Sequence, residues 1–267
     1  MCLVVLAIAR SDRFPWVVAA NRDEFFDRPA EPLAWWQPRA DAPPVLGGRD
    51  LAAGGSWLAL SQSGRMAVLT NVREPARFDP SLPTRGDLVP QWVQGEDLVV
   101  AVGRALRNGF NLVGADLHAD AAVWMTNRPA IRQQTITRGT HGLSNAALDT
   151  PWPKVSRLMA HIDAVVDAAG GDRRTLVDGA FAALADPLPA SDAELPATGV
   201  PLAIERQLSS AFIRFDTPRG VYGTRCSTVL VVEREADGRR TAHVVERCFD
   251  AEGGVEGETT VRVAFDG

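Results

Sequence analysis

Cys2, the second residue of this chain, carries its most distinctive chemistry. It follows Met1 directly and opens a strand-like apolar run over residues 2–9. If Met1 is removed, as a small second residue usually permits, this one residue supplies a thiol nucleophile and, in its free α-amine, a base. The α-amine has an ordinary pKa of about 8, so a useful fraction accepts protons at neutral pH. A cysteine in an apolar strand is otherwise a small hydrophobic residue, and the residue alone leaves both interpretations open.

A polar cluster, Asn21-Arg-Asp-Glu24, follows a second apolar run at residues 15–20. A polar turn at residues 11–13 separates the two runs, which predicts a hairpin of two strands closed by the polar cluster. Such a hairpin returns the cluster towards the start of the chain. We therefore expect Cys2 and the cluster to be neighbours in space.

Composition limits the class of partner. The 267 residues are 46% hydrophobic and 23% charged, as in a globular protein of one large or two small domains. A net charge of −5 argues against nucleic acid, which requires a basic face. No apolar run approaches the roughly 18 residues of a membrane span, and the short N-terminal run does not have the form of a signal peptide. Three scattered cysteines fit neither a disulfide framework nor a zinc site, so we expect a cytoplasmic protein.

Hydrophobic periodicity predicts blocks of strands and helices in alternation. A Pro- and Trp-containing stretch over residues 28–44, to which we assign no strand, follows the first hairpin. We predict further strands at residues 56–61, 65–71, 110–116, 121–126, 131–137, 221–234, 241–248 and 258–265, and helices at residues 86–94, 96–107, 153–169 and 172–185. Residues 73–85 and 186–201 are expected to be connections.

The order of these blocks favours an α+β fold with two mostly antiparallel sheets stacked between helices, since a doubly wound parallel sheet would alternate strand by strand. The last hairpin allows a finer prediction. If its turn is centred on Asp237, Cys226 lies opposite Cys248, and the two form a pair of adjacent reduced thiols.

Several phrases of the sequence together resemble a known family. They are Cys2, Asn21-Arg-Asp-Glu24, Thr70-Asn-Val-Arg-Glu74, the stretch from His141-Gly-Leu-Ser-Asn145 to Pro151-Trp-Pro-Lys154, and Tyr222-Gly-Thr-Arg-Cys-Ser-Thr228. In this order they resemble the NRDE-motif family, also called the transport and Golgi organisation 2 family. The resemblance spans essentially the whole chain.

This resemblance implies a single domain over residues 1–267 with the fold of N-terminal-nucleophile hydrolases, a four-layer αββα sandwich. Its cysteine branch includes choloylglycine hydrolases and penicillin V acylases, in which a thiol attacks an amide carbonyl. Matched by motif, Cys2 is the nucleophile and Asp23 orients its amine. Asn71 and Asn145 supply oxyanion donors, and Arg225 matches the arginine that steadies the catalytic centre.

Each of these roles has a plainer alternative. Asn21 and Asp23 are residue types that end strands, and Asn145 could be a turn residue before a helix. Arg225 could be an ordinary strand arginine, because all but one of the 28 basic residues are arginine. His141, followed by glycine, is typical of a loop.

One position departs from the comparison enzymes. They usually carry arginine immediately before the asparagine of the NRDE segment, where this chain has Ala20, and Arg22 follows the asparagine instead. This departure puts substrate orientation, and turnover itself, in question.

The sequence therefore supports two hypotheses. The first is a hydrolase of a small amide (C–N) bond, acting through Cys2 with no required cofactor. The second is a non-catalytic intracellular binding or trafficking protein for haem or for acyl-CoA and lipid ligands, functions to which the resembled family is linked. The candidate ligand-binding residues are Asn21, Arg22, Asp23, Glu24, Arg73 and His141.

For the second hypothesis, Cys2 or His141 would ligate iron and arginines would meet phosphates. The arginines concerned are Arg22, Arg28, Arg73 and Arg77. The shape of the pocket is expected to come from residues 25–45 and 73–85.

Overall fold

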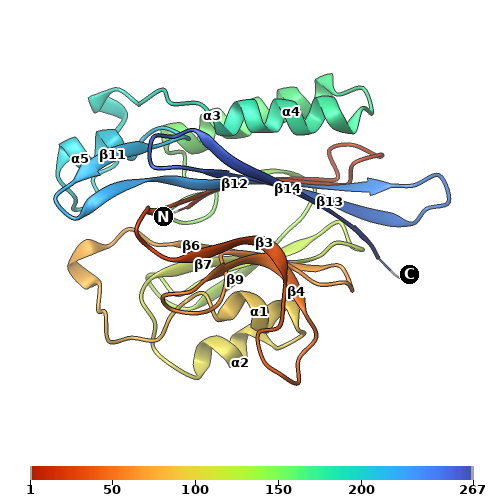
Figure 1. Ribbon diagram of the computed structural model, residues 1–267, viewed down its shortest axis with the longest axis horizontal. Helices are drawn as coiled ribbons and strands as arrows, with labels where there is room; N and C mark the ends of the chain where they lie inside the picture. The colour runs from red at the N-terminus through yellow and green to blue at the C-terminus, as the bar shows by residue number, and fades with distance from the viewer. Residues whose placement is uncertain (1, 266–267) are drawn as a thin grey trace.

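Four layers of secondary structure stack in the order helices, sheet, sheet, helices (Figure 1). The computed structural model describes residues 2–265, and Cys2 by its backbone only. Both sheets are antiparallel, each with seven strands. The α+β sandwich predicted from the sequence is confirmed.

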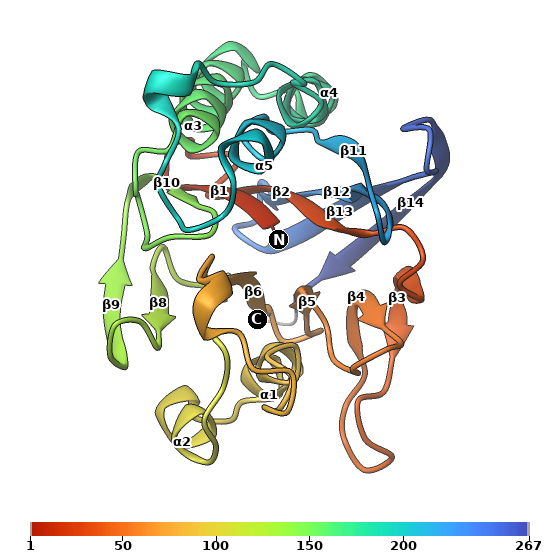
Figure 2. The ribbon, with the colours of Figure 1, turned by 90° about the vertical axis from the view of Figure 1, so that its left-hand side faces the viewer.

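The first sheet contains the first and last strands of the chain and the NRDE segment. Its strands, in spatial order, are β10 (Gly139–Leu143), β1 (Cys2–Ile8), β2 (Trp16–Phe25), β12 (Gly220–Arg234), β13 (Arg240–Phe249) and β14 (Val255–Ala264), with β11 (Arg214–Thr217) paired to β12. Two long helices, α3 (Pro153–Ala168) and α4 (Arg173–Leu184), cover its outer face (Figure 1). The short helix α5 (Leu202–Gln207) lies beside β11 (Figure 2).

The second sheet is a meander of seven consecutive strands. These are β3 (Ala30–Trp36), β4 (Val45–Asp50), β5 (Leu58–Leu60), β6 (Arg65–Asn71), β7 (Phe110–Asp116), β8 (Ala122–Thr126) and β9 (Arg132–Ile136). The helices α1 (Leu88–Val93) and α2 (Leu98–Gly103) pack on its outer face. Two single turns of 3₁₀ helix, Pro75–Arg77 and Asp192–Glu194, lie in the connections.

The alternation of side chains along β1 shows why this strand is fixed in place. Val4 and Leu6 enter the core between the two sheets, whereas Leu3 and Val5 pack under the helices. All four are 0% exposed. A slip by one residue would exchange the two faces, so the position of the β1 start is well determined by packing on both sides.

The register of the strands confirms two predictions and corrects another. Cys2 pairs with Arg22 across β1 and β2, and Cys226 pairs with Cys248, with no disulfide at either of the latter two. The NRDE segment does not close the hairpin, however, because β2 continues through it to Phe25. It is held there by pairing with β12 as well as β1, which overrides the turn preference of Asn and Asp.

Other segments were assigned incompletely by the sequence. The strand β3 lies within the Pro-rich stretch, and β4, β10, α5 and β11 lie in segments where we predicted no element. Most of these missed elements are short and lack a clear period. The predicted helices at residues 86–94 and 96–107 are each reduced to six residues.

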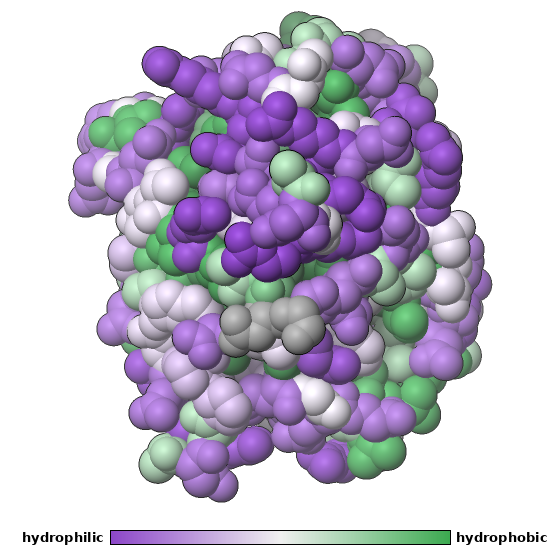
Figure 3. Space-filling model, turned by 90° about the vertical axis from the view of Figure 1, so that its right-hand side faces the viewer, coloured by the Kyte–Doolittle hydropathy of each residue, from purple (hydrophilic) through white to green (hydrophobic). Residues whose placement is uncertain are grey.

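Within the described residues, no helix is both long and apolar enough to cross a membrane. Figure 3 shows one face of the molecule, on which hydrophilic residues predominate and apolar ones are scattered among them.

Candidate functional site

The start of β1 lies beside the middle of the NRDE segment. Cys2 and Arg22 are cross-strand partners, and Asp23 follows Arg22 on β2. The expected proximity of the chain start to the NRDE segment is thus confirmed for the backbone. The thiol of Cys2 lies outside the described part of the chain, and its catalytic role stays a prediction.

Asp23 is a buried carboxylate held by β12. It is 1% exposed; its Oδ1 accepts a hydrogen bond of 2.9 Å from the Thr224 hydroxyl, and its backbone carbonyl accepts one of 3.0 Å from the Tyr222 hydroxyl. Burial raises the pKa of Asp23, and Lys154 is foremost among the described groups that act in the opposite direction. A carboxylate in this position has a fixed orientation and is shielded from water.

Asn71 and Asn145 are neighbours, but their side chains have different surroundings. The Asn145 side-chain amide donates to the backbone carbonyl of Asn71 at 2.8 Å, and the backbone carbonyl of Asn145 accepts from the Arg73 N–H at 2.8 Å. Asn145 is 1% exposed and serves to fix the end of β6. Asn71, the last residue of β6, lines two cavities and is the better placed of the two to donate to a bound molecule.

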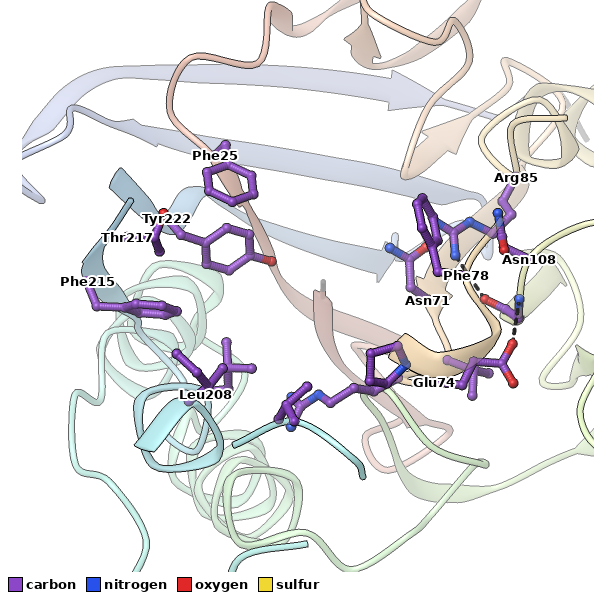
Figure 4. A pocket seen from close by; sticks show the side chains of 16 residues that line it. Phe25, Asn71, Glu74, Phe78, Arg85, Asn108, Leu208, Phe215, Thr217 and Tyr222 are labelled. Atoms are coloured by element: carbon purple, nitrogen blue, oxygen red, sulfur yellow. Dashed lines mark hydrogen bonds between the residues drawn. The ribbon is translucent and has the colours of Figure 1, made fainter. Parts of the chain in front are cut away.

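The first cavity, of about 480 Å³, has mainly apolar walls. Figure 4 shows Phe25, Phe215, Tyr222 and Leu208 on one side and Asn71 with its neighbours on the other. Its lining residues are Phe25, Asn71, Val72, Arg73, Glu74, Pro75, Phe78, Arg85, Asn108, Gly109, Val200, Ile204, Leu208, Phe215, Thr217 and Tyr222. The predicted segments 25–45 and 73–85 supply part of this wall, the former only through Phe25. Residues 200–217, which include α5 and β11, supply much of the remainder, together with the end of β6, the start of β12 and residues 108–109.

A second cavity, also of about 480 Å³, is polar and reaches the NRDE segment. Its charged lining residues are Arg22, Asp23, Glu24, Arg28, Asp50, Arg85 and Arg219. The two cavities share five lining residues, namely Asn71, Phe78, Arg85, Asn108 and Tyr222. The site therefore has an apolar part and a charged part that meet at these five residues, Asn71 among them.

Arg22 and Glu24 lie in the charged cavity in contact with other side chains. The guanidinium of Arg22 stacks 4.2 Å from the Trp57 ring centroid and lies 3.8 Å from Asp50. Trp57 fits there because residue 48 is glycine: a Cβ at Gly48 would lie 2.0 Å from the Trp57 ring. Glu24 accepts a hydrogen bond of 2.8 Å from the backbone N–H of the next residue.

Asn21, the first residue of the NRDE segment, points away from both cavities. Its amide nitrogen donates to the carbonyls of Leu184 and Ala211 at 2.9 Å, and its oxygen accepts from the Ser227 hydroxyl at 2.6 Å. These bonds join β2 to the end of α4, so in this structure Asn21 holds elements together instead of lining the site.

Arg225 occupies a β-bulge of β12, between Thr224 and Cys226. Its guanidinium donates to the carbonyls of Phe25 at 2.8 Å and Arg28 at 3.0 Å, and burial lowers its pKa. It lines a third cavity of about 360 Å³, on the side of Cys226 rather than on that of Asn71. Arg225 therefore lines the third cavity together with Arg22, but it lines neither of the two joined cavities.

His141 is a strand residue and not the loop residue expected from its sequence. It lies on β10 opposite Leu6, with Nδ1 2.9 Å from the Asp149 carboxylate and Nε2 3.1 Å from the Thr137 carbonyl. The bond to Asp149 raises the pKa of His141. Both ring nitrogens are occupied by the protein, and His141 lines none of the cavities described above.

Arg73 and the other arginines predicted to bind phosphate differ in how far their side chains are engaged by the protein. Arg73 is buried in an ion pair with Glu205 and stacks 4.8 Å from the Trp152 ring centroid. Arg28 donates to Asp50 at 2.8 Å, whereas Arg77 is exposed. Within the described residues, no cluster of three or more His, Cys, Asp or Glu side chains is arranged to hold a metal ion.

Sequence reasoning missed two of the buried charged residues around the site, Lys154 and Glu205, both 2% exposed. The one available signal was that Lys154 is the only lysine of the chain. Glu205 gave no signal, because it lies in the short helix α5, which was not predicted.

The arrangement of sheets and helices is that of proteins with the N-terminal-nucleophile hydrolase fold. Among solved structures, it is similar to a conjugated bile acid hydrolase from Clostridium perfringens, with a TM-score of 0.51 over 98% of this chain and 92% of that one. The identity is 6%, so this likeness concerns the fold alone.

Sequence comparison then defines the family. The family model described as transport and Golgi organisation 2 matches residues 1–251, and the chain belongs to this family. It is 35% identical to the transport and Golgi organization protein 2 homolog of Bos taurus and 33% identical to that of Homo sapiens, covering 84% of each chain in both comparisons.

Proposed function

We propose that this protein hydrolyses an amide bond of a small N-acyl compound through the thiol of Cys2. One observation carries the proposal: the start of β1 pairs with the strand segment of the buried Asp23, and Asp23 lines a charged cavity that shares Asn71 and four other residues with an apolar cavity. The apolar cavity suits an acyl chain, and the charged cavity suits the polar amine that is released.

The proposed reaction requires removal of Met1, which frees the α-amine of Cys2. The thiol passes its proton to this amine as sulfur bonds to the amide carbonyl carbon. The resulting oxyanion collapses, the C–N bond breaks, and the leaving amine takes the proton from the α-ammonium. Water then attacks the thioester, which releases the acid and restores the thiol.

The described residues support two of the roles that this reaction needs. Asp23, which Thr224 orients, would hold the α-ammonium through charge. Asn71 lies where both cavities meet, and a neutral amide stabilises an oxyanion without competing for the proton. The named activity of the bile acid hydrolase, which shares the fold, is in keeping with this chemistry.

The first experiment measures hydrolysis of acyl-aminomethylcoumarins with chains of two, six and ten carbons. The intact mass of the purified protein first establishes whether Met1 is absent. We expect the longer chains to be preferred, and Cys2→Ala to abolish release of the fluorescent amine. Unchanged hydrolysis by the Cys2→Ala variant would refute the proposal.

Alkylation with iodoacetamide provides a second readout at the thiol itself. Burial, reinforced by Glu246, raises the pKa of Cys248 to about 12, and Cys226 is only 4% exposed. Both thiols should therefore react slowly. We expect Cys2 to be labelled first and the label to remove activity in proportion.

A second candidate function is non-catalytic binding of an apolar ligand that carries anionic groups, such as an acyl-CoA or haem. The arginines that line the charged cavity next to the apolar one favour it, in particular Arg85 and Arg219. Palmitoyl-CoA and haemin are the probes, titrated against the wild type and against Cys2→Ala. Saturable binding by both proteins, with no hydrolysis of any coumarin, would favour this function over the first.

A further inference from the structure

The third cavity, of about 360 Å³, is lined by two cysteines that the proposed hydrolysis does not use, Cys226 and Cys248. They are directly opposed on the antiparallel strands β12 and β13. Residues opposed in this way share one face of a sheet, with Cα atoms about 4.5 or 5.5 Å apart. A disulfide spans Cα separations of about 4.4 to 6.8 Å. The register of the two strands therefore brings these cysteines within disulfide range.

A buried carboxylate, that of Glu246, adjoins both thiols. Glu246 lies two residues before Cys248 on β13, and residues two apart on a strand point to the same face. The Cys248 thiol donates to the Glu246 carboxylate at 3.8 Å, and the Cys226 side chain bonds to the same carboxylate. Bonds from the Thr228 hydroxyl and the Leu33 N–H hold Glu246 in place. Glu246 is thus a fixed proton acceptor for the two thiols.

The cavity gives a small molecule access to this cluster. Cys248 is partly exposed and lines the cavity, whereas Cys226 beside it is 4% exposed. Burial, reinforced by Glu246, raises the pKa of Cys248 to about 12, so the resting thiol is protonated. Because the thiolate is the nucleophile, reaction of Cys248 requires a neighbouring base. Burial also raises the pKa of Glu246, which makes its carboxylate a stronger base.

The backbone of Cys2 is too far from this pair to take part in the same disulfide. Cys2 pairs with Arg22 of β2, and Arg22 pairs with Cys226 of β12. Two strand spacings, about 10 Å in all, therefore separate the backbones of Cys2 and Cys226. This separation exceeds the disulfide range. The cysteine pair of the third cavity is accordingly distinct from the proposed hydrolase site.

We propose that Cys226 and Cys248 form a redox-active dithiol, which a small hydroperoxide entering the third cavity converts into a cross-strand disulfide. The Cys248 sulfur attacks one peroxide oxygen as its proton passes to Glu246, and the O–O bond breaks. The departing oxygen takes that proton and leaves as an alcohol, or as water where the oxidant is hydrogen peroxide. Cys248 is then a sulfenic acid.

The second step closes the disulfide. The Cys226 sulfur attacks the sulfenic sulfur of Cys248, the S–O bond breaks, and the hydroxide leaves as water with the proton of the Cys226 thiol. The two thiols together lose two electrons and two protons, and the hydroperoxide gains both.

The test treats the reduced wild-type protein with hydrogen peroxide and blocks the remaining thiols with N-ethylmaleimide in urea. A non-reduced tryptic digest is then analysed by mass spectrometry. Cleavage after Arg225 and Arg247 places the two cysteines in separate peptides, residues 226–234 and 248–262. We expect these peptides to be linked, with the loss of two hydrogens, and the link to disappear with dithiothreitol. The link should also form in Cys2→Ala, which separates this inference from the proposed hydrolysis.

The role of Glu246 is tested by Glu246→Gln, which keeps the side-chain shape and removes the base. We expect the link to form at least about tenfold more slowly than in the wild type. Glu233→Gln is the control, because it removes another buried carboxylate of β12, bound by Arg13 and Arg173, and should leave the rate unchanged. An unchanged rate in Glu246→Gln would overturn the assignment of Glu246 as the base.

The outcome in the wild type decides the main proposal without requiring any variant to fold. Full labelling of both Cys226 and Cys248 by N-ethylmaleimide after peroxide treatment would overturn it. A disulfide that joins either residue to Cys2, or to a second molecule, in place of the link between residues 226 and 248 would overturn it equally.

Discussion

At the scale of single residues, the polar side chains of the NRDE segment and its neighbours divide into two groups. Asp23 and Asn71 line the joined cavities. Asn21 and Asn145, in contrast, donate their side-chain hydrogen bonds to backbone carbonyls of the protein. The division follows from geometry and not from residue type, since three of these four residues are asparagines.

Replacement of Asn71 and of Asn145 should therefore have different consequences. Under the proposed hydrolase function, Asn71→Ala removes the proposed oxyanion donor, and we expect hydrolysis of the decanoyl coumarin to fall about 100-fold or more with little change in stability. Asn145→Ala removes the buried bond to the Asn71 carbonyl, and we expect a loss of about 1 to 3 kcal/mol in the free energy of unfolding.

The measurements are kcat for the coumarin substrate and urea unfolding of both variants. If Asn71→Ala kept the wild-type kcat while Asn145→Ala did not, the oxyanion donor would be Asn145. The position of Asn71 between the two cavities would then not contribute to catalysis.

At the scale of elements, β2 links the site to the helices outside it. Asn21 binds the carbonyls of Leu184, the last residue of α4, and of Ala211. The last carbonyls of a helix lack intrahelical partners. The amide of Asn21 therefore joins the end of α4 to the strand that also presents Asp23.

We expect Asn21→Ala to destabilise the fold by about 2 kcal/mol or more, because two buried carbonyls lose their side-chain donor. The folded protein should still be alkylated at Cys2 at the wild-type rate. Urea unfolding and the alkylation rate are measured, with Gln133→Ala on the exposed side of β9 as the control. A ligand-binding role for Asn21 would instead show as lost alkylation or lost binding at unchanged stability.

The elements also show what could be predicted from the sequence. Runs with a clear period were predicted well: the helix at residues 153–169 and the hairpin register that pairs Cys226 with Cys248 are both confirmed. The NRDE segment was placed beside Cys2 correctly, yet its strand conformation was missed because pairing on both edges outweighs local preference.

The walls of the apolar cavity were harder to predict. One side comes largely from residues 200–217, where α5 and β11 are only six and four residues long. Elements of this length carry too few residues to establish a period. The sequence also does not show that Arg73 forms an ion pair with Glu205, because the two residues are brought together only by tertiary packing.

At the scale of the whole molecule, a buried carboxylate joins the two sheets. Glu246 on β13 of the first sheet is 1% exposed; it accepts a hydrogen bond of 2.6 Å from the backbone N–H of Leu33 in the second sheet. The Thr228 hydroxyl donates a further bond of 3.0 Å. Burial raises the pKa of Glu246 above its ordinary value, because burial disfavours the charged form of a carboxyl group.

The sign of the pH effect follows from that shift. Between its ordinary pKa of 4.5 and the raised one, folded Glu246 binds more protons than the unfolded chain does, so its contribution to stability falls as pH rises through this window. Glu246→Gln removes the titration and keeps an acceptor for Leu33. We expect the variant to be more stable than the wild type at pH 7, by about 1.4 kcal/mol for each unit of raised pKa, and the difference to disappear below pH 4.5.

Glu233→Gln is the matched control, because its sign is opposite. Arg13 and Arg173 pair with Glu233 and lower its pKa despite its burial, so its contribution is present above the ordinary pKa and is lost as pH falls through the lowered one. Urea unfolding from pH 4 to pH 8 should thus show Glu246→Gln gaining and Glu233→Gln losing stability at neutral pH. If Glu246→Gln were destabilised equally at every pH, the hydrogen bonds of Glu246, and not its burial, would determine how the two sheets are held together.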